Sequence, residues 1–430
     1  MDNSLHLRAM VAIKPFKGLR YDQDKVKDFS LAITPPYDVI NEKQKEEFYK
    51  MSAFNMARLI LPESVSSSAR DFLQWQKQGV LKQDEESIYL YSQEFSYKGK
   101  KYVRNGFISL VLLEDLGKGI LPHEKTLDKP LKGRLELLSA TKANYGSIFL
   151  LYDDRERITD RMITEICTRE PDMQFSDKFQ IGHKLWKVSD QEVIKRFSAE
   201  LSKYQCVIAD GHHRYKSALQ FSKDHPEIES AKYAMSCFVN SFSEGLLVLP
   251  IDRFVYDVSI EHEKLLSELP PYFDVTEMES PSKAIEKLEK TKVMVDKTKN
   301  LKNHVFAMHS CANNKSYFLK LKEADIMESI FPEKSDVYRK LDVNILHKIV
   351  FEKIMGISRE AQAAGTNIDY SKDPNRDIGQ ACGTYQYLFF INAPLMREIF
   401  LTARAGETMP QKSTFFYPKV YSGLVINKIA

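Results

Sequence analysis

The central element of the fold is predicted by Tyr204-Gln205-Cys206-Val207-Ile208-Ala209-Asp210-Gly211-His212-His213-Arg214, which continues into Tyr215 to Phe221. The apolar run before Asp210 predicts a buried strand, and the residues after Gly211 predict a helix. A strand that turns through Asp-Gly into a helix leaves free backbone N–H groups and the positive dipole end of the helix at the turn. This geometry favours an anion, and the planar guanidinium of Arg214 matches phosphate oxygens.

The same five residues, Asp210 to Arg214, carry further chemistry. Asp210 offers a hard oxygen ligand that suits Mg²⁺. Two adjacent histidines and an arginine at a tight turn are poor core material, so the turn predicts chemistry on a phosphorylated ligand. A metallohydrolase that uses Asp210, His212, His213 and His123 as metal ligands is the weaker interpretation, because the chain has no H-x-H or H-E-x-x-H spacing.

Composition sets the class of protein. The chain has 430 residues, 43% hydrophobic and 28% charged, which are ordinary values for a globular protein of two or three domains. Its 62 basic and 59 acidic residues leave a net charge of +3, which does not favour a nucleic-acid partner. No apolar run approaches the roughly 18–20 residues that span a bilayer, and the N-terminus lacks a signal-peptide pattern. We therefore expect no membrane partner.

The cysteines are odd in number and far apart, and none forms a C-x-x-C pair. They are Cys167, Cys206, Cys237, Cys311 and Cys382. This usage predicts a cytoplasmic protein whose cysteines are reduced and mostly act as small core residues.

Mixed periodicities predict an α+β fold with several small mixed sheets and flanking helices. We expect an N-terminal region over 1–120, a core over 121–250 and a C-terminal region over 251–430. Helices are predicted over 41–50, 68–77, 129–142, 190–202, 261–269, 282–290 and 344–355. Strands are predicted over 88–96, 102–113, 147–152, 233–240, 246–250, 304–309, 316–321 and 387–391.

A second candidate site is Leu121-Pro122-His123-Glu124-Lys125-Thr126. Proline forces an extended entry, so His123 and Glu124 are expected on an irregular loop, where the Glu124 carboxylate could serve as a general base. Lys125 and Thr126 could reach a phosphate. The alternative is a helix or turn cap with a solvated charge pair.

Two further segments are candidates. Residues 409–419 pack two lysines and two hydroxyls between prolines and aromatic residues, and they could close over an anionic ligand. The alternative is an edge strand that packs its aromatic residues on the core. Near the N-terminus, residues 14–20 and 35–39 could present the carboxylate of Asp38, or could form a rigid corner capped by it.

Six motifs carry a resemblance to a known family. They are KPFKGLRYD (14–22), PPYDVI (35–40), HEKT (123–126), ADGHHRY (209–215), LDVNILHK (341–348) and MPQKSTFFYPK (409–419). By these motifs the sequence is identified as a member of the domain-of-unknown-function family ten-fifteen, and the resemblance covers essentially the whole chain.

More distantly, the D-G-H-H-R turn resembles the ParB/sulfiredoxin superfamily, in which this turn binds nucleotide phosphates. Sulfiredoxins carry a catalytic cysteine as G-C-H-R, where this chain has His212, and ParB proteins carry G-E-R-R with a helix-turn-helix that is not evident here. Free-serine kinases pair D-G-H-H-R with an upstream H-E dipeptide. This chain has both, and the long separation between Glu124 and Asp210 implies an insertion over about residues 150–200.

The resemblance implies a kinase that transfers a phosphoryl group from ATP, or ADP, to free L-serine and yields O-phospho-L-serine for cysteine biosynthesis. It implies Glu124 as the base, with His123 beside it. It implies that Asp210 is a ligand of Mg²⁺. It also implies that the nucleotide phosphates are bound by Gly211, His212, His213 and Arg214, and that Thr126 contacts a phosphate. His213 would also stabilise charge in the transition state.

Three residues are guesses for the serine carboxylate or a phosphate: Lys412, Ser413 and Lys14. Two other functions remain open at this point. One is a nucleotide-binding regulatory or partition-like module without small-molecule kinase activity, and the other is a metal-dependent phosphohydrolase. The sequence does not decide between ATP and ADP as donor, or whether the chain forms homo-oligomers.

Overall fold

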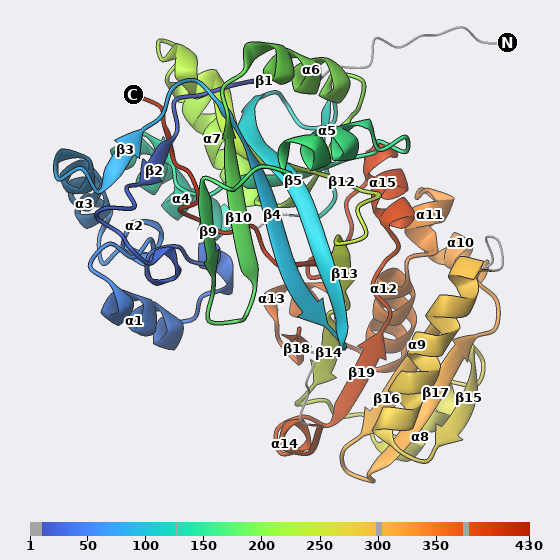
Figure 1. The fold of residues 1–430 in the computed structure, drawn as a ribbon. Coiled ribbons are helices and arrows are strands. Elements are labelled where there is room, and N and C mark those ends of the chain that lie inside the picture. Colours follow the sequence, from blue (N-terminus) through green and yellow to red (C-terminus); the bar gives the residue numbers. More distant parts are fainter. Residues whose placement is uncertain (1–10, 126–127, 298–302, 373–377) are drawn as a thin grey trace, which may run out of the picture. The chain divides into compact units, whose positions relative to one another are not determined.

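The computed structural model describes residues 11–125, 128–297, 303–372 and 378–430 (Figure 1). It has the predicted α+β class, with mixed sheets and flanking helices. The chain forms two compact units. Unit 1 comprises Met1–Pro122, Thr126–Leu247 and Phe416–Ala430, and unit 2 comprises His123–Lys125 and Val248–Phe415.

Unit 1 is built on a large mixed sheet. Its strands run in the order β6-β11-β8-β12-β5-β4-β10-β9, and β1 also pairs with β5. They are β1 (Ile13–Lys14), β4 (Ile88–Tyr97), β5 (Lys100–Leu112), β6 (Ile120–Pro122), β8 (Ile148–Tyr152), β9 (Met173–Ser176), β10 (Gly182–Val188), β11 (Cys206–Asp210) and β12 (Tyr233–Asn240). The segment over 150–200, where the resemblance implies an insertion, contains β9 and β10, which extend this sheet.

Two short ribbons complete the strands of unit 1, β2 (Leu19–Tyr21) with β3 (Leu81–Gln83) and β7 (Ala143–Asn144) with β21 (Asn427–Lys428). The helices of unit 1 are η1 (Phe29–Leu31), η2 (Tyr37–Val39), α1 (Glu42–Met51), α2 (Ala57–Ile60), α3 (Val65–Lys77), α4 (Asp128–Thr141), α5 (Ile158–Ile166), α6 (Gln191–Leu201), α7 (His212–Asp224) and η3 (Glu229–Lys232). Helices α5, α6 and α7 pack apolar faces on the large sheet, in a core that includes Phe107, Phe197 and Phe221.

Parallel pairing within this sheet positions the candidate motifs. Strand β6 pairs with β11 in parallel, with Pro122 opposite Ile208. Parallel neighbours end at the same edge of a sheet. The segment that begins at His123 therefore leaves the sheet at the edge where β11 turns through Gly211 into α7.

Unit 2 is built on an antiparallel sheet in the order β15-β17-β16-β19-β14-β18. The strands are β14 (Asp252–Val255), β15 (Phe273–Met278), β16 (Val305–Ser310), β17 (Lys315–Leu321), β18 (Ile368–Ser371) and β19 (Tyr387–Ile391). Helix α9 (Pro281–Lys297) lies across the sheet (Figure 1) and packs Ala284 and Leu288 against Phe318 and Phe390.

The other helices of unit 2 are α8 (His262–Glu268), α10 (Ile326–Ile330), α11 (Asp336–Arg339), α12 (Asp342–Ile345), η4 (Leu346–Ile354), α13 (Arg359–Ala364), α14 (Ile378–Cys382) and α15 (Met396–Arg404). Strands β13 (Leu247–Leu249) and β20 (Phe415–Tyr417) contain points at which the chain passes from one unit to the other. The chain passes between the units at Leu247–Val248 and at Phe415–Phe416. The expected regions over 1–120, 121–250 and 251–430 stay predictions.

Most predicted helices and strands are present, and two details differ. Helix α6 begins one residue later than predicted, at Gln191, because Asp190 is its N-cap and accepts from the backbone N–H groups of Glu192 and Val193. The helix predicted over 344–355 starts earlier, as α12, and continues as the nine-residue π-helix η4. Apolar spacing does not distinguish an α-helix from a π-helix over so short a segment.

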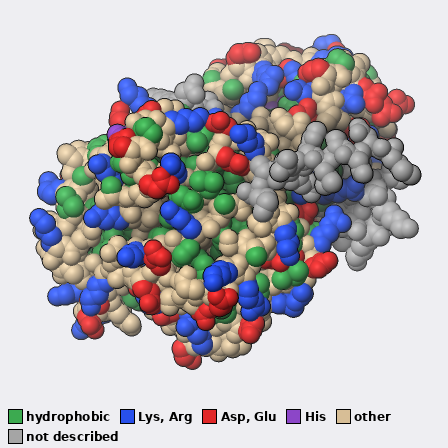
Figure 2. Space-filling model, turned by 90° about the horizontal axis from the view of Figure 1, so that it is seen from above, with side chains coloured by type: hydrophobic (Ala, Val, Ile, Leu, Met, Phe, Trp, Pro, Cys, Tyr) green, Lys and Arg blue, Asp and Glu red, His purple; other side chains and the backbone are tan. Residues whose placement is uncertain are grey.

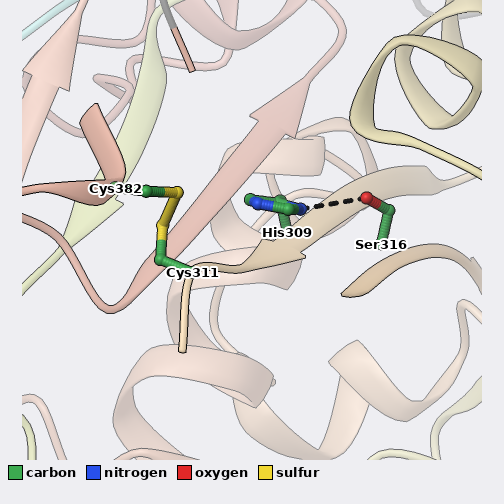
Figure 3. Close-up of a disulfide and its surroundings, with 4 residues drawn as sticks. All are labelled: His309, Cys311, Ser316 and Cys382. Carbon is green, nitrogen blue, oxygen red and sulfur yellow. Dashed lines mark hydrogen bonds between the residues drawn. A yellow bond between two sulfur atoms is a disulfide. The ribbon is translucent and has the colours of Figure 1, made fainter. Parts of the chain in front are cut away.

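The cysteines correct a second expectation. Cys311 and Cys382 form a disulfide that closes 71 residues of sequence, so these two are not reduced core residues (Figure 3). Cys167, Cys206 and Cys237 are free, and the last two are buried as expected. Partners this far apart in sequence are brought together only by the tertiary fold.

No described helix combines the length and the apolar character needed to cross a bilayer. Figure 2 shows Lys and Arg side chains interspersed with Asp and Glu on the face seen from above. This mixing on one face matches the near balance of basic and acidic residues in the sequence.

Candidate functional site

The centre of the candidate site in unit 1 is the turn between β11 and α7. Gly211 has φ of +90° and is the N-cap residue of α7, which begins at His212 as predicted. A Cβ atom at Gly211 would lie 2.9 Å from Nε of Arg214. Both the left-handed backbone and this close approach require glycine. The first turn of the thirteen-residue helix, whose N–H groups have no acceptor within the helix itself, therefore lies beside the Arg214 guanidinium.

Within the described residues, the two terminal nitrogens of the Arg214 guanidinium, Nη1 and Nη2, donate hydrogen bonds, and Nε does not. Nη1 donates to the carbonyl of Ser147 at 2.7 Å, and Nη2 donates to Asp210. The Nε–H group is buried and has no hydrogen-bond partner among the described residues. A buried donor without a partner costs free energy, and an anion at the turn would supply the missing acceptor.

Asp210 is held between two cations. Its Oδ1 accepts from Lys419 and its Oδ2 from Arg214, and the Asp210 side chain is only 13% exposed. Burial alone would raise the pKa of this carboxyl, but the Lys419 ammonium and the Arg214 guanidinium outweigh burial and hold the pKa far below its usual range. Asp210 therefore stays ionised.

The paired state of Asp210 bears on the predicted Mg²⁺ site. A carboxylate is the ligand type that Mg²⁺ prefers, so the residue fits the ion chemically. Because each oxygen already accepts from a cation, direct ligation would displace Lys419 or Arg214. An Asp210 carboxylate that keeps its ion pairs with Lys419 and Arg214 can contact Mg²⁺ only through a water molecule.

A small cavity of about 70 Å³ adjoins Arg214. Tyr37, Arg134, Gly146 and Ser422 are among its lining residues, and the Arg134 guanidinium lies 4.0 Å from the centre of the Tyr37 ring. Pockets that enclose a whole small-molecule ligand usually measure roughly 300–1,000 Å³. This cavity therefore suits one group of a ligand rather than an entire nucleotide.

Sequence reasoning missed several of these residues as site residues. Lys419 and Tyr37 lie inside the motifs 409–419 and 35–40, for which the sequence predicts Lys412 and Asp38 as the functional residues. Their position within those motifs was the available signal. For Arg134 and Ser422 the sequence offered none.

The other site residues that the sequence predicts outside unit 2 do not all lie at the turn. His212 is buried and His213 is half-buried, both in the first turn of α7. Lys14 lies on β1, with its ammonium 3.6 Å from the centre of the Tyr233 ring, and it does not line the cavity beside Arg214. Thr126 lies outside the described residues.

The candidate base belongs to unit 2, where two motifs meet. The backbone N–H of Met409 donates to the carbonyl of His123 at 2.8 Å, and Glu124 forms a parallel bridge with Met409. The backbone N–H of Lys412 donates to Oε1 of Glu124. Lys412 has φ of +59°, an uncommon backbone conformation for a residue with a side chain. The HEKT and MPQKST motifs thus hold the Glu124 carboxylate in a set orientation.

The neighbours of Glu124 serve mainly as supports. His123 is fully buried, and its Nε2 lies 2.8 Å from Oγ1 of Thr414. The hydroxyl of Ser413 donates to the Pro410 carbonyl at 2.6 Å. Lys412 contributes its backbone, while its side chain is exposed. Buried Arg253, which the sequence did not suggest, donates to the Lys412 carbonyl at 3.1 Å.

Within the described residues, one group of three His, Cys, Asp or Glu side chains has donor atoms close enough for a metal ion. It is His309, Cys311 and Cys382, whose ligand atoms lie within 4.8 Å of one another, but the two sulfur atoms are joined in the disulfide and offer no thiolate to a metal. Figure 3 shows the His309 ring between the disulfide and Ser316. Asp210, His212, His213 and His123, the ligands of the metallohydrolase alternative, do not form such a group.

Comparison with known proteins places the sequence in a family. The family model described as "Protein of unknown function (DUF1015)" matches residues 13–344. The chain belongs to the DUF1015 family. The motif-based identification from the sequence is therefore confirmed. No curated protein matches the chain.

Solved structures provide three similar proteins. A variant of free serine kinase in complex with ADP is 15% identical, with 69% of this chain and 84% of that chain covered and a TM-score of 0.34. A conserved hypothetical protein from Pyrococcus furiosus is 18% identical, with 70% and 89% covered and a TM-score of 0.33. SbnI with a C-terminal truncation, from Staphylococcus aureus, is 12% identical, with 72% and 84% covered and a TM-score of 0.35.

Proposed function

We propose that this protein transfers the terminal phosphoryl group of ATP to the hydroxyl of free L-serine and yields O-phospho-L-serine. The observation that carries the proposal is the parallel pairing of β6 with β11 in register Pro122 to Ile208. One strand is followed by His123-Glu124 and the other by the Asp210–Arg214 turn. The two motifs that free-serine kinases combine thus leave one sheet at one edge.

The phosphate end of the reaction is assigned to the Gly211–Arg214 turn. Backbone N–H groups at the start of α7 and the unpartnered Nε–H of Arg214 are donors suited to phosphate oxygens. His212 and His213 lie in the same turn, and His213 is assigned to the charge that develops on the moving phosphoryl group. Mg²⁺ on the nucleotide would neutralise phosphate charge, and Asp210 would contact it through water.

The acceptor end of the reaction is assigned to Glu124. The serine hydroxyl gives its proton to the Glu124 carboxylate as the serine oxygen bonds to the terminal phosphorus of ATP. The bond between that phosphorus and the bridging oxygen breaks, and ADP leaves. The N–H of Lys412 orients the carboxylate, which is what a positioned general base requires.

The product suits a defined metabolic use. A phosphate on the serine β-carbon is a better leaving group than a hydroxyl, so sulfide can replace it and yield cysteine and inorganic phosphate. We therefore assign the protein to the supply of phosphoserine for cysteine biosynthesis, and to the cytoplasm.

Phosphorus NMR of the purified protein with Mg²⁺, ATP and a mixture of free amino acids tests the function. We expect a new phosphomonoester resonance that depends on L-serine, with release of ADP. A parallel sample with ADP as the donor decides which nucleotide is used. Nucleotide binding without a phosphorylated amino acid would contradict the proposal and favour a regulatory nucleotide-binding module. Phosphate release from simple phosphoesters without ATP would favour a phosphohydrolase.

Gly211→Ala tests the phosphate grip. The new Cβ would displace Arg214, so we expect nucleotide affinity, measured by titration calorimetry, to fall by roughly tenfold or more, which is the contribution of one charge-assisted hydrogen bond. Gly79→Ala is the matched control, because Gly79 has φ of +68° and its Cβ would meet nothing within 4 Å. Equal affinities in the two variants would remove Arg214 from the grip.

A further inference from the structure

Unit 2 contains a larger cavity that the proposed reaction does not use. Its volume is about 330 Å³, within the usual range for sites that enclose a small molecule. Three sequence motifs contribute residues to its wall. These are Lys125 from HEKT; Asn344, His347 and Lys348 from LDVNILHK; and Pro410 and Gln411 from MPQKSTFFYPK. Segments more than 200 positions apart in the chain are thus brought to one hollow.

The wall contributed by LDVNILHK has an unusual backbone. The π-helix η4 runs over nine residues, Leu346–Ile354, and after it the N–H of Met355 donates to the carbonyl of Val350 at 2.9 Å. Such wide turns are rare and are frequently found at functional sites. Here the π-helix supplies His347 and Lys348 to the cavity.

The hydrogen bond from Arg253 assigns the tautomer of His347. Arg253 is buried, and burial lowers its pKa to about 10, so the guanidinium stays protonated at neutral pH. Its Nε–H donates to Nε2 of His347 at 3.2 Å. Burial, Arg253 and Lys348 hold the pKa of His347 well below its usual range, so the ring is neutral. With Nε2 as the acceptor, the ring proton is on Nδ1, and His347 is a donor on that side.

The cations at the cavity are not all neutralised. Lys348 pairs with Glu352. Lys125 and Arg359 also line the cavity, and both are exposed. Neither forms a side-chain hydrogen bond or an ion pair within the part of the chain that the structure describes. Glu360 is the other carboxylate at the wall, so the lining charges sum to one positive.

We propose that this cavity binds a small organic anion, through a carboxylate or a phosphate group. Lys125 and Arg359 supply the charge, and the Arg359 fork suits either kind of anion. The neutral His347 supplies an uncharged donor, and the rings of Tyr338 and Tyr370 supply apolar wall for the rest of the ligand. The site lies entirely within unit 2 and does not depend on the proposed kinase reaction.

Calorimetric titration of the full chain, without nucleotide or Mg²⁺, tests this site. The probes are acetate for a carboxylate, inorganic phosphate for a phosphate, and 3-phosphoglycerate for both. We expect at least one probe to bind, and the Lys125→Gln/Arg359→Gln double variant to bind it roughly 10- to 100-fold more weakly. Binding of acetate but not phosphate identifies carboxylate recognition, and the reverse identifies phosphate recognition.

The control is Lys283→Gln, which removes an exposed lysine of α9 in the same unit that does not line the cavity. We expect the control to bind like the unmodified protein, and circular dichroism to show that both variants are folded. The proposal is overturned if no probe binds at millimolar concentration, or if the double variant and the control bind equally. Because no nucleotide is present, a failure to phosphorylate serine leaves this result unaffected.

Discussion

Glu124→Gln is expected to lower the rate of serine phosphorylation by roughly 10²–10⁴-fold, the usual contribution of a general base. The amide oxygen of glutamine can still accept the N–H of Lys412, so the segment should keep its conformation. The amide cannot take the proton of the serine hydroxyl. The loss should therefore fall on turnover, while nucleotide affinity measured by calorimetry should stay unchanged.

A surface glutamate provides the comparison for Glu124. Glu244 is 83% exposed and lies 4.0 Å from Arg157, so Glu244→Gln should leave turnover at the level of the unmodified protein. Near-normal turnover in Glu124→Gln would remove this residue from the role of base. A simultaneous loss of nucleotide affinity would instead indicate that the substitution disturbs the binding site.

Asp210→Asn is expected to lower the free energy of unfolding at pH 7 by about 3–5 kcal/mol, the typical cost of breaking a buried ion pair from one side. The substitution leaves two cations, Lys419 and Arg214, only 10% and 14% exposed and without their shared carboxylate. Urea unfolding monitored by circular dichroism and by tryptophan fluorescence measures the change, because both tryptophans, Trp75 and Trp186, lie in unit 1. An unchanged midpoint would show that the pairs contribute little.

The stabilisation from Asp210 has a defined pH dependence. The folded protein holds the pKa of this carboxyl below its ordinary value of 3.8. A lowered folded-state pKa means that the stabilisation is complete above about pH 4 and is lost as the pH falls through the folded-state pKa. The stability difference between the unmodified protein and Asp210→Asn should therefore be constant near neutral pH and should shrink below about pH 4.

Asp115→Asn is the matched control for Asp210→Asn. Asp115 also pairs with a lysine, Lys223, but both side chains are more than half exposed. Exposed pairs contribute little because water screens them. We expect no measurable change in unfolding for this variant. A loss as large as that of Asp210→Asn would show that burial is not the cause of the effect.

Local features of the sequence were enough to predict the β11–turn–α7 element. The apolar run before Asp210 needs burial, Gly211 permits the left-handed turn, and the residues that follow are compatible with a helix. Each of these preferences acts over a few neighbours in the chain, so no knowledge of the tertiary fold was needed. The α+β class and most helices and strands followed in the same way.

Long-range contacts were outside the reach of sequence reasoning. Lys419 reaches Asp210 across 209 positions, and Lys412 reaches Glu124 across 288. In each case the sequence contains both partners, but it does not specify which donor meets which carboxylate. The Cys311–Cys382 disulfide, whose partners lie 71 positions apart, belongs to the same class.

The order of residues supplies a strand–turn–helix element at Asp210–Arg214, a carboxylate at Glu124 and the motifs of the DUF1015 family. The tertiary fold sets how these groups are arranged. It placed β6 beside β11, paired both oxygens of Asp210, left Nε of Arg214 without a partner among the described residues, and brought three motifs to one cavity in unit 2. The physical reason is that local preferences select helices, strands and turns, whereas strand register and packing, which depend on the whole chain, select the partners of each side chain.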